Sequence, residues 1–183
     1  VKVPLSLRPG EAMTTLEPKG VVLIIGPWNY PFSLIIQPLV SVLAAGNTAV
    51  LKPSEHAPAT SELITSLLPK YLSQKVIRIF QGDGKLAADL VDKHFDHIFF
   101  TGGSATGKDV MAAAAKHLTP VTLELGGKSP AIVIEGANLE VTARRIVWGK
   151  MLNAGQTCIA PNHLIVQQQL KEPLIKAMKI ELK

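Results

Sequence analysis

Short apolar runs rich in β-branched residues alternate with segments of helical spacing along almost the whole chain. The runs at 20–26, 47–53, 75–82 and 97–102 predict buried strands, and a helix-like segment follows each of them. Successive parallel strands need a crossover connection, which is usually a helix. The alternation therefore predicts an α/β fold in which helices flank an open, mostly parallel sheet.

The same reasoning extends to the rest of the chain. Further strands are predicted at 120–127, 129–135 and 162–169. Helices are predicted at 32–46, 57–72, 84–93, 104–118, 138–155 and 170–182. In parallel sheets ligands bind at the carboxyl ends of the strands, so the loops that follow the strands are the candidate binding loops. They come after Ile25, Val50, Phe80, Phe100 and Leu125.

The composition describes a globular chain. Of its 183 residues, 47% are hydrophobic and 18% are charged, which excludes a disordered chain and suits roughly one domain with a real core. The net charge of +5 comes from scattered lysines and arginines, with no dense basic run interleaved with aromatic residues. We therefore predict a mildly basic surface and no nucleic-acid partner.

The cysteine count and the chain ends bear on the cellular compartment. Cys158 is the single cysteine, so no disulfide can form within the chain, and this predicts a cytoplasmic protein. The opening residues lack the basic and long apolar regions of a signal peptide. The start at valine and the abrupt ending "KIELK" suggest a piece of a longer protein.

The longest apolar stretch, at 21–46, does not predict a membrane span. A spanning helix needs about 20 mostly apolar residues in an unbroken run. This stretch is interrupted by Pro27, Asn29, Pro31, Gln37 and Pro38. Membrane association is therefore not indicated in this segment.

Two glycine-rich motifs could hold a phosphate. "GGSATGKD" (102–109) has the spacing of a P-loop, but that motif needs Ser or Thr after its lysine to ligate magnesium, and Asp109 stands there. A carboxylate in the first turn of a helix is the simpler interpretation of Asp109. "GDGKLA" (82–87) fits a dinucleotide fingerprint, but the next predicted strand lacks the acid that should follow it. A glycine-rich turn before a helix explains it equally well.

Several longer motifs occur together in one order along the chain. They are "GPWNYPF" (26–32), "LKPSE" (51–55), "LELGGKSP" (123–130) and "GQTC" (155–158). In this order they closely resemble the aldehyde dehydrogenase superfamily, and their flanking residues are most similar to its class 3 branch, which handles fatty and aromatic aldehydes. The resemblance covers nearly the whole chain, and the chain covers under half of such a protein.

The resemblance implies a Rossmann-like sheet followed by the start of a second α/β domain. On this basis residues 1–125 belong to a dinucleotide-binding domain whose N-terminal part is missing, and residues 126–183 begin a truncated catalytic domain. The implied activity is oxidation of aldehydes to carboxylic acids with NAD or NADP. The implied partners are a small-molecule aldehyde and, for the full-length protein, a second copy in a homodimer. We expect this chain by itself to be inactive.

Three side chains are candidates for the chemistry. Aldehyde oxidation needs a soft nucleophile that adds to the carbonyl, and the thiolate of Cys158 is the one candidate. By resemblance, the side-chain amide of Asn29 and the backbone N–H of Cys158 stabilise the oxyanion formed by that addition. Glu124 is the candidate general base for hydrolysis of the thioester, because burial in an apolar strand would make a carboxylate more basic.

The resemblance also implies the cofactor contacts. Lys52 and Glu55 match positions that bond the adenosine ribose hydroxyls, and an acid at Glu55 favours NAD over NADP, although the class 3 branch often takes both. Trp28 and the loop at 102–107 match the pyrophosphate region, and Gly126 lies near the nicotinamide. The predicted cofactor-binding residues are Ile25, Gly26, Pro27, Trp28, Lys52, Glu55, Gly82, Gly102, Gly103, Ser104, Gly107 and Gly126.

One residue departs from the family pattern. Gly103 stands directly after "FTG" where a polar residue is usual, and Ser104 comes next. This puts the side-chain contact to phosphate in doubt, and backbone N–H groups or Ser104 are its replacements.

No metal site is predicted. "HFDH" (94–97) brings two histidines near Asp92 and Asp96, but the four share no evident face, so we interpret them as surface polar residues. Two alternatives to the dehydrogenase remain: a P-loop-like nucleotide-binding enzyme and a non-catalytic NAD-binding fragment.

Overall fold

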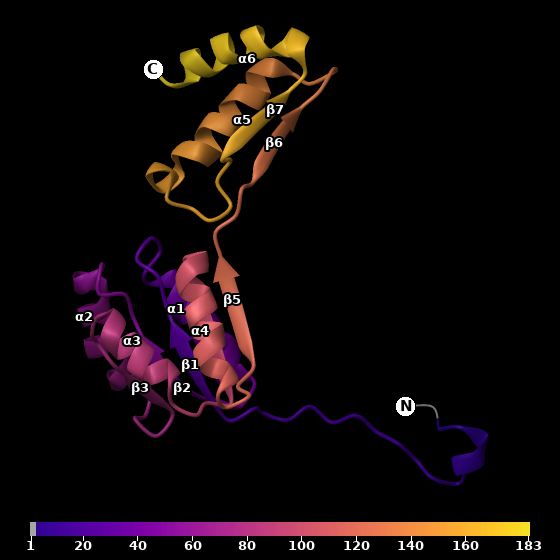
Figure 1. The fold of residues 1–183 in the computed structure, drawn as a ribbon, viewed down its shortest axis with the longest axis vertical. Coiled ribbons are helices and arrows are strands. Elements are labelled where there is room, and N and C mark those ends of the chain that lie inside the picture. The colour runs from indigo at the N-terminus through magenta and orange to yellow at the C-terminus, as the bar shows by residue number, and fades with distance from the viewer. Residues whose placement is uncertain (1–2) are drawn as a thin grey trace.

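A five-stranded parallel sheet forms the middle layer of the larger unit of the molecule, in a computed structural model that describes residues 3–183 (Figure 1). Its strand order is β3-β2-β1-β4-β5, and every neighbouring pair is parallel. The strands are β1 (Val21–Ile25), β2 (Thr48–Lys52), β3 (Ile77–Ile79), β4 (His97–Gly102) and β5 (Val121–Leu125). The open parallel sheet expected from the alternating pattern is confirmed.

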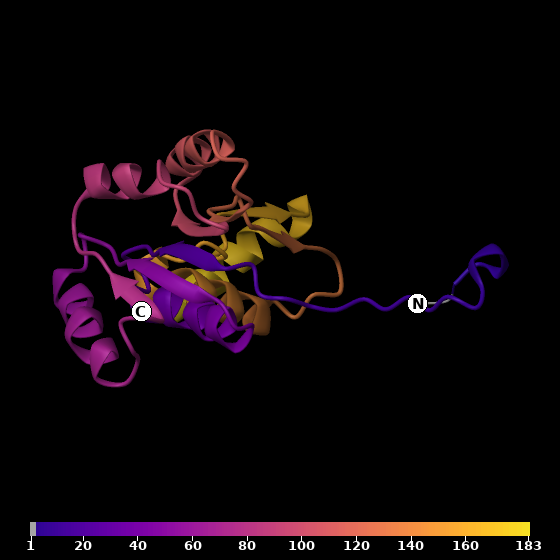
Figure 2. The same ribbon diagram turned by 90° about the horizontal axis from the view of Figure 1, so that it is seen from below.

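Helices cover both faces of this sheet, as seen from below in Figure 2. They are α1 (Ser33–Ala44), α2 (Pro58–Leu67), α3 (Gly84–Val91) and α4 (Ser104–Ala115). Val22 and Ile24 of β1 are buried in one core with residues of α1 and α2, whereas Leu23 and Ile25 are buried in another with residues of α3 and α4. Burial on both faces explains why the strands read as continuous apolar runs. Each fully buried aliphatic side chain of this kind contributes about 1.5–3 kcal/mol.

A smaller unit follows β5 along the chain and is drawn above the sheet in Figure 1. It contains the parallel pair β6 (Pro130–Val133) and β7 (His163–Val166), with α5 (Leu139–Met151) and α6 (Gln168–Glu181). Its core includes Val133, Ala143, Ile146 and Leu174. Three short 3₁₀ helices complete the structure: η1 (Leu5–Leu7), η2 (Leu68–Lys70) and η3 (Leu152–Gly155).

Some predicted boundaries were wrong for identifiable reasons. The helix expected at 138–155 ends at Met151, because Asn153 and Ala154 adopt left-handed backbone angles. The last expected strand ends at Val166, and α6 already begins at Gln168. Asp109 is not in the first turn of its helix, because α4 begins at Ser104.

The segment before β1 runs away from the sheet as an extended arm, visible in both ribbon views. Most of its residues from Glu11 to Pro18 are exposed. No helix within residues 3–183 has the length and apolar character needed to cross a bilayer.

Candidate active site

The site lies where β1 and β4 run side by side at the middle of the sheet. β1 leads into α1 on one face and β4 leads into α4 on the other, so the two connections diverge at the carboxyl ends of these strands. Such a switch point is the usual ligand-binding crevice of an open α/β sheet. Two cavities meet there and share Pro27, Trp28 and residues 101–103 as lining.

The first cavity has a volume of about 970 Å³ and contains all three predicted catalytic side chains. We call it the cysteine cavity. Asn29 reaches it from the loop after β1, Glu124 from β5, and Cys158 from the segment after η3. Residues separated by up to 129 positions in the sequence are therefore brought together around one space.

The loop that carries Cys158 has an unusual backbone. Asn153 and Ala154 have φ angles of 51° and 55°, and Gly155 follows with 79°. Thr157 then begins a turn in which its carbonyl accepts a hydrogen bond of 3.1 Å from the Ala160 N–H. Cys158 is the first central residue of this turn, and its free thiol is exposed. The turn therefore presents the thiol to solvent and to the cavity.

Hydrogen bonds attach this loop to the loop after β1. The Asn29 amide donates to the Gln156 carbonyl at 2.7 Å, and the Asn153 amide donates to the Asn29 carbonyl at 2.8 Å. An asparagine amide has two N–H groups, so Asn29 keeps a second donor for another acceptor. The loop at 153–160, which carries the predicted nucleophile Cys158 and is called the nucleophile loop below, is therefore held against the predicted oxyanion donor Asn29.

Glu124 faces the cysteine cavity because side chains alternate along β5. Leu123 and Leu125 pack into the core beneath α4, which turns Glu124 to the opposite face, next to Thr101 in the strand register. We expected Glu124 to be buried, but its side chain is exposed. The reason is that β5 is the edge strand of its sheet. Its placement, rather than desolvation, is what suits it to contact water.

Several polar residues that line this cavity are not among the predicted site residues, and His97 and Thr101 are two of them. His97 was assigned to the surface, but it lies in β4 and lines the cavity, with Nε2 2.9 Å from the Thr122 hydroxyl. Burial lowers the pKa of His97, and the positive charge of Lys19 lowers it further. His97 Nδ1 and the Thr101 hydroxyl are buried without a hydrogen-bond partner among the described residues. The period-two alternation of the strand at 97–102 was the signal that could have found them.

Among the other residues of the "HFDH" region, His94 and Asp96 line neither cavity, whereas Asp92 lines the second cavity together with Lys116. His94 packs its ring edge-on against His117 at 6.0 Å between centroids. Asp92 pairs with Lys116 at 2.6 Å, and this ion pair lowers the pKa of the Asp92 carboxyl. Within residues 3–183 no group of three or more His, Cys, Asp or Glu side chains converges as a metal site would require.

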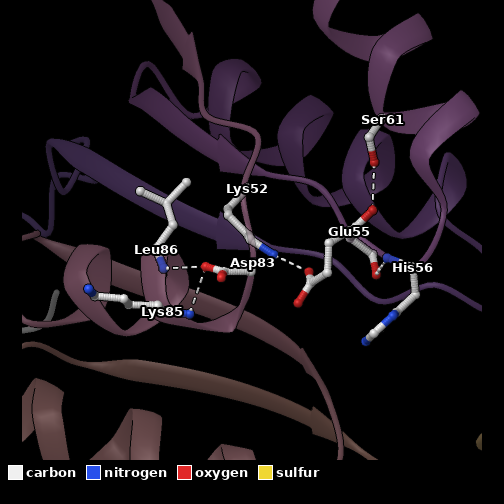
Figure 3. A network of polar contacts seen from close by, with 8 residues as sticks. Lys52, Glu55, His56, Ser61, Asp83, Lys85 and Leu86 are labelled. Atoms are coloured by element: carbon white, nitrogen blue, oxygen red, sulfur yellow. Dashed lines mark hydrogen bonds and ion pairs between the residues drawn. The ribbon is translucent and has the colours of Figure 1, made fainter.

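The second cavity has a volume of about 700 Å³ and lies between the strand ends, α3 and α4. We call it the lysine cavity, after the buried Lys52, whose ammonium forms an ion pair with Glu55 (Figure 3). Partial burial alone would raise the pKa of Glu55, but the hydrogen bond and the charge of Lys52 outweigh it and hold this pKa below its ordinary value. Glu55 is therefore an ionised acceptor beside a cationic donor.

A hydrogen bond from α2 holds the turn that carries Glu55. The buried Ser61 hydroxyl donates a hydrogen bond of 2.7 Å to the carbonyl of Ser54, the first residue of this turn (Figure 3). The Ser54 carbonyl also accepts from the Ala57 N–H at 3.2 Å, which closes the turn. The donor–acceptor pair at the end of β2 is thus held by α2.

Most predicted cofactor residues line these cavities. Those in the lysine cavity are Ile25, Gly26, Pro27, Trp28, Lys52, Glu55, Gly102 and Gly103. Gly126 lines the cysteine cavity. Gly103 lines both cavities and precedes the first turn of α4 with an extended backbone and no side-chain cap, so the uncapped N-terminus of α4 begins beside the junction of the cavities.

Gly82, Ser104 and Gly107 are not among the lining residues of either cavity. A Cβ at Gly107 would lie 2.8 Å from Leu125 Cδ2, so glycine there permits α4 to pack closely on β5. A Cβ at Gly82 would meet Leu86 at 2.4 Å, and the helix after it is capped by Asp83, which accepts from the Lys85 and Leu86 N–H groups. Both glycines thus have packing roles.

Comparison with known proteins agrees with this arrangement. Residues 2–183 match the family model described as "Aldehyde dehydrogenase family". The chain belongs to the aldehyde dehydrogenase family. It is 49% identical over 179 residues to aldehyde dehydrogenase family 3 member A2 of Macaca fascicularis, which confirms the resemblance to the class 3 branch. It is 50% identical over 167 residues to the dimeric NADP-preferring aldehyde dehydrogenase of Rattus norvegicus.

Solved structures of this family share the fold. A substrate-bound AldH of Staphylococcus aureus superposes on the whole chain with a TM-score of 0.96 at 44% identity, and the chain covers 40% of it. An aldehyde dehydrogenase of Bacillus cereus in complex with NAD⁺ superposes on 88% of the chain with a TM-score of 0.83 at 37% identity. The chain spans 37% of the length of each of the two curated relatives, macaque and rat.

Proposed function

We propose that this chain forms part of an NAD(P)-dependent aldehyde dehydrogenase that oxidises aldehydes to carboxylic acids. In this proposal residues 1–125 belong to the dinucleotide-binding domain and residues 126–183 begin the catalytic domain. The observation that carries the proposal is the convergence of Cys158, Asn29 and Glu124 on one cavity at the sheet switch point.

The first step is addition of the Cys158 thiolate to the carbonyl carbon of the aldehyde. A C–S bond forms and the carbonyl oxygen becomes an oxyanion. The second N–H of the Asn29 amide, which is not used by Gln156, supplies a donor for this oxygen. Donors that are already fixed stabilise the developing charge without reorganisation, and the hydrogen bonds to the nucleophile loop fix this one.

The lysine cavity fits a nicotinamide dinucleotide. Its cationic Lys52 and ionised Glu55 form the donor and acceptor that a ribose diol needs, and the open N-terminus of α4 suits a pyrophosphate. When bound there, NAD or NADP would supply the hydride acceptor that the oxidation needs, and loss of that hydride from the carbon attached to Cys158 would convert the adduct into a thioester. Residues 101–103 line both cavities, so a dinucleotide held at Lys52 would have room to extend toward the cavity that contains Cys158.

Glu124 is proposed as the base that releases the acid product. Its carboxylate would take a proton from a water molecule as that water attacks the thioester, which restores the Cys158 thiolate. Exposure to the cavity gives it access to water.

We also propose the remaining partners. A carboxylate at Glu55 accepts a ribose 2′-hydroxyl and repels a 2′-phosphate, which favours NAD. One relative is nevertheless named NADP-preferring and dimeric, so we retain both cofactors and a homodimer of the intact protein. The free, exposed thiol fits the reducing conditions of the cytoplasm.

The alternative P-loop enzyme is disfavoured. Gly107 packs against Leu125, and Asp109 stands where the magnesium ligand would be. Such an enzyme would hydrolyse ATP in a magnesium-dependent way.

Rapid-mixing measurements of NADH formation by the intact protein test the proposal. We expect Cys158→Ala to abolish the initial burst, because no thiohemiacetal can form. We expect Glu124→Gln to keep the burst and stall afterwards at the thioester. A normal burst in Cys158→Ala would refute the mechanism, whereas a wild-type protein that binds NAD but forms no NADH with any aldehyde would leave a non-catalytic NAD-binding role.

A further inference from the structure

The backbone before Cys158 needs support from elsewhere in the fold. Asn153 and Ala154 both have positive φ angles, although neither is glycine. Residues in this left-handed region carry strain and persist where surrounding contacts hold them. The three direct tethers from the loop after β1 are therefore candidates for what keeps the nucleophile loop in place.

Two of these tethers involve Asn29, which the proposed chemistry already uses. The third joins the Tyr30 hydroxyl to the Thr157 hydroxyl at 2.7 Å, in a partly buried position. Such a distance is typical of a well-formed O–H···O hydrogen bond. Neither hydroxyl takes part in the proposed reaction, so the function of this hydrogen bond must be sought in the position of the loop.

The two residues stand beside the reacting groups in the sequence. Tyr30 directly follows Asn29, and Thr157 directly precedes Cys158. Thr157 lines the cysteine cavity, whereas Tyr30 is not among its lining residues. A change at the Tyr30 hydroxyl therefore reaches the cavity through Thr157 and the backbone of Cys158.

We propose that Tyr30 is a positioning residue whose hydrogen bond to Thr157 sets the distance between the Cys158 sulfur and the Asn29 amide. This rests on the proposed function of these two groups. The bond fixes the residue before the nucleophile to the residue after the oxyanion donor, across 127 positions of sequence. Nucleophilic addition is sensitive to displacements of this kind, since even a misplacement of about 1 Å lowers the rate strongly.

The test compares Tyr30→Phe and Thr157→Val in the intact protein by rapid mixing with aldehyde and NAD. We expect the rate constant of the NADH burst to fall by about threefold to tenfold in each, as expected for one partly buried hydrogen bond. The KM for NAD stays unchanged, because the lysine cavity does not include either residue. Thr157→Ser keeps the hydroxyl and restores the burst rate.

Two further comparisons isolate the hydrogen bond. Tyr71→Phe removes the same hydroxyl from a tyrosine that is 78% exposed and outside both cavities, and it leaves the burst unchanged. The double variant Tyr30→Phe, Thr157→Val is no slower than the slower single variant, because the two hydroxyls act as one pair. A wild-type burst rate in Tyr30→Phe, or losses that multiply in the double variant, overturns the proposal.

Hydrogen exchange separates this inference from the proposed function. Exchange of the amides at 153–160 needs no aldehyde turnover, and we expect it to quicken in both single variants relative to Tyr71→Phe. If the wild-type protein gave no aldehyde-dependent burst, the dehydrogenase proposal would fail, while quickened exchange would still support the tether. Unchanged exchange in both variants overturns the tether itself.

Discussion

The side-chain amide of Asn29 donates a hydrogen bond of 2.7 Å to the carbonyl of Gln156, two residues before Cys158. Asn29 lies in the loop after the central strand β1, and Gln156 follows η3 in the smaller α/β unit. One amide thus joins the two parts of the molecule and keeps a second N–H for a substrate oxygen. A substitution that removes the Asn29 amide therefore removes both the contact with the Cys158 loop and the proposed oxyanion donor.

Asn29→Ala should therefore slow acylation more than loss of the Tyr30–Thr157 hydrogen bond does. We expect the burst rate constant to fall by about 10²–10³, the loss typical of one missing oxyanion donor. Asn162→Ala is the matched control, because Asn162 is exposed and lines neither cavity. A loss smaller than about threefold would remove Asn29 from the oxyanion site.

Gly155→Ala should destabilise the nucleophile loop. Gly155 has a φ of 79°, and an added Cβ would lie 3.1 Å from the Lys150 carbonyl oxygen. We expect the free energy of unfolding to fall by about 1–3 kcal/mol in urea titrations, together with a slower NADH burst. Gly136→Ala provides the comparison, since its φ is 85° but its Cβ would meet nothing within 4 Å. It should cost less stability and leave the burst unchanged.

Gly107→Val tests the packing role of this glycine. Its side chain would meet Leu125 at the contact between α4 and β5, where a Cβ alone comes within 2.8 Å. We expect a loss of about 1–3 kcal/mol in the free energy of unfolding, as for other overpacked sites. Gly103→Ala adds a Cβ into open space and should be tolerated. Equal stability of the two variants would contradict the packing interpretation.

The Lys52–Glu55 ion pair should make stability depend on pH in acid. The pKa of Glu55 is lowered from its ordinary value of 4.5, so this carboxylate stabilises the folded state above that pH. The stabilisation is lost as the pH falls below 4.5 through the lowered pKa of the folded state. We expect Glu55→Gln to flatten the decline of unfolding free energy in this window, measured by urea titration.

The control for this measurement is Glu62→Gln, at an exposed position on α2. It should keep the wild-type pH dependence. An identical acid decline in Glu55→Gln and wild type would show that the ion pair with Lys52 contributes nothing to it.

Local patterns predicted the strands well, because a strand that is buried on both faces needs apolar residues at successive positions. The run at 20–26 is apolar throughout, and β1 indeed contributes alternate residues to two cores. The break after Met151 left no comparable apolar pattern, and the left-handed residues Asn153 and Ala154 belong to a segment that contacts the distant loop after β1 through the Asn153 amide. The partial burial of His97 and the exposure of Glu124 likewise depend on which strands become neighbours and which lies at the edge.

The sequence by itself determined the parallel α/β sheet, the family and the identity of the candidate nucleophile, because these depend on residue types at short spacing. Only the tertiary structure decided that Asn29, Glu124 and Cys158 share one cavity and that Tyr30 meets Thr157. Asn29 is 95 positions from Glu124 and 129 from Cys158, and contacts across such separations follow from strand order and chain crossing. No local spacing encodes these distances, since they exist only once the elements have packed together.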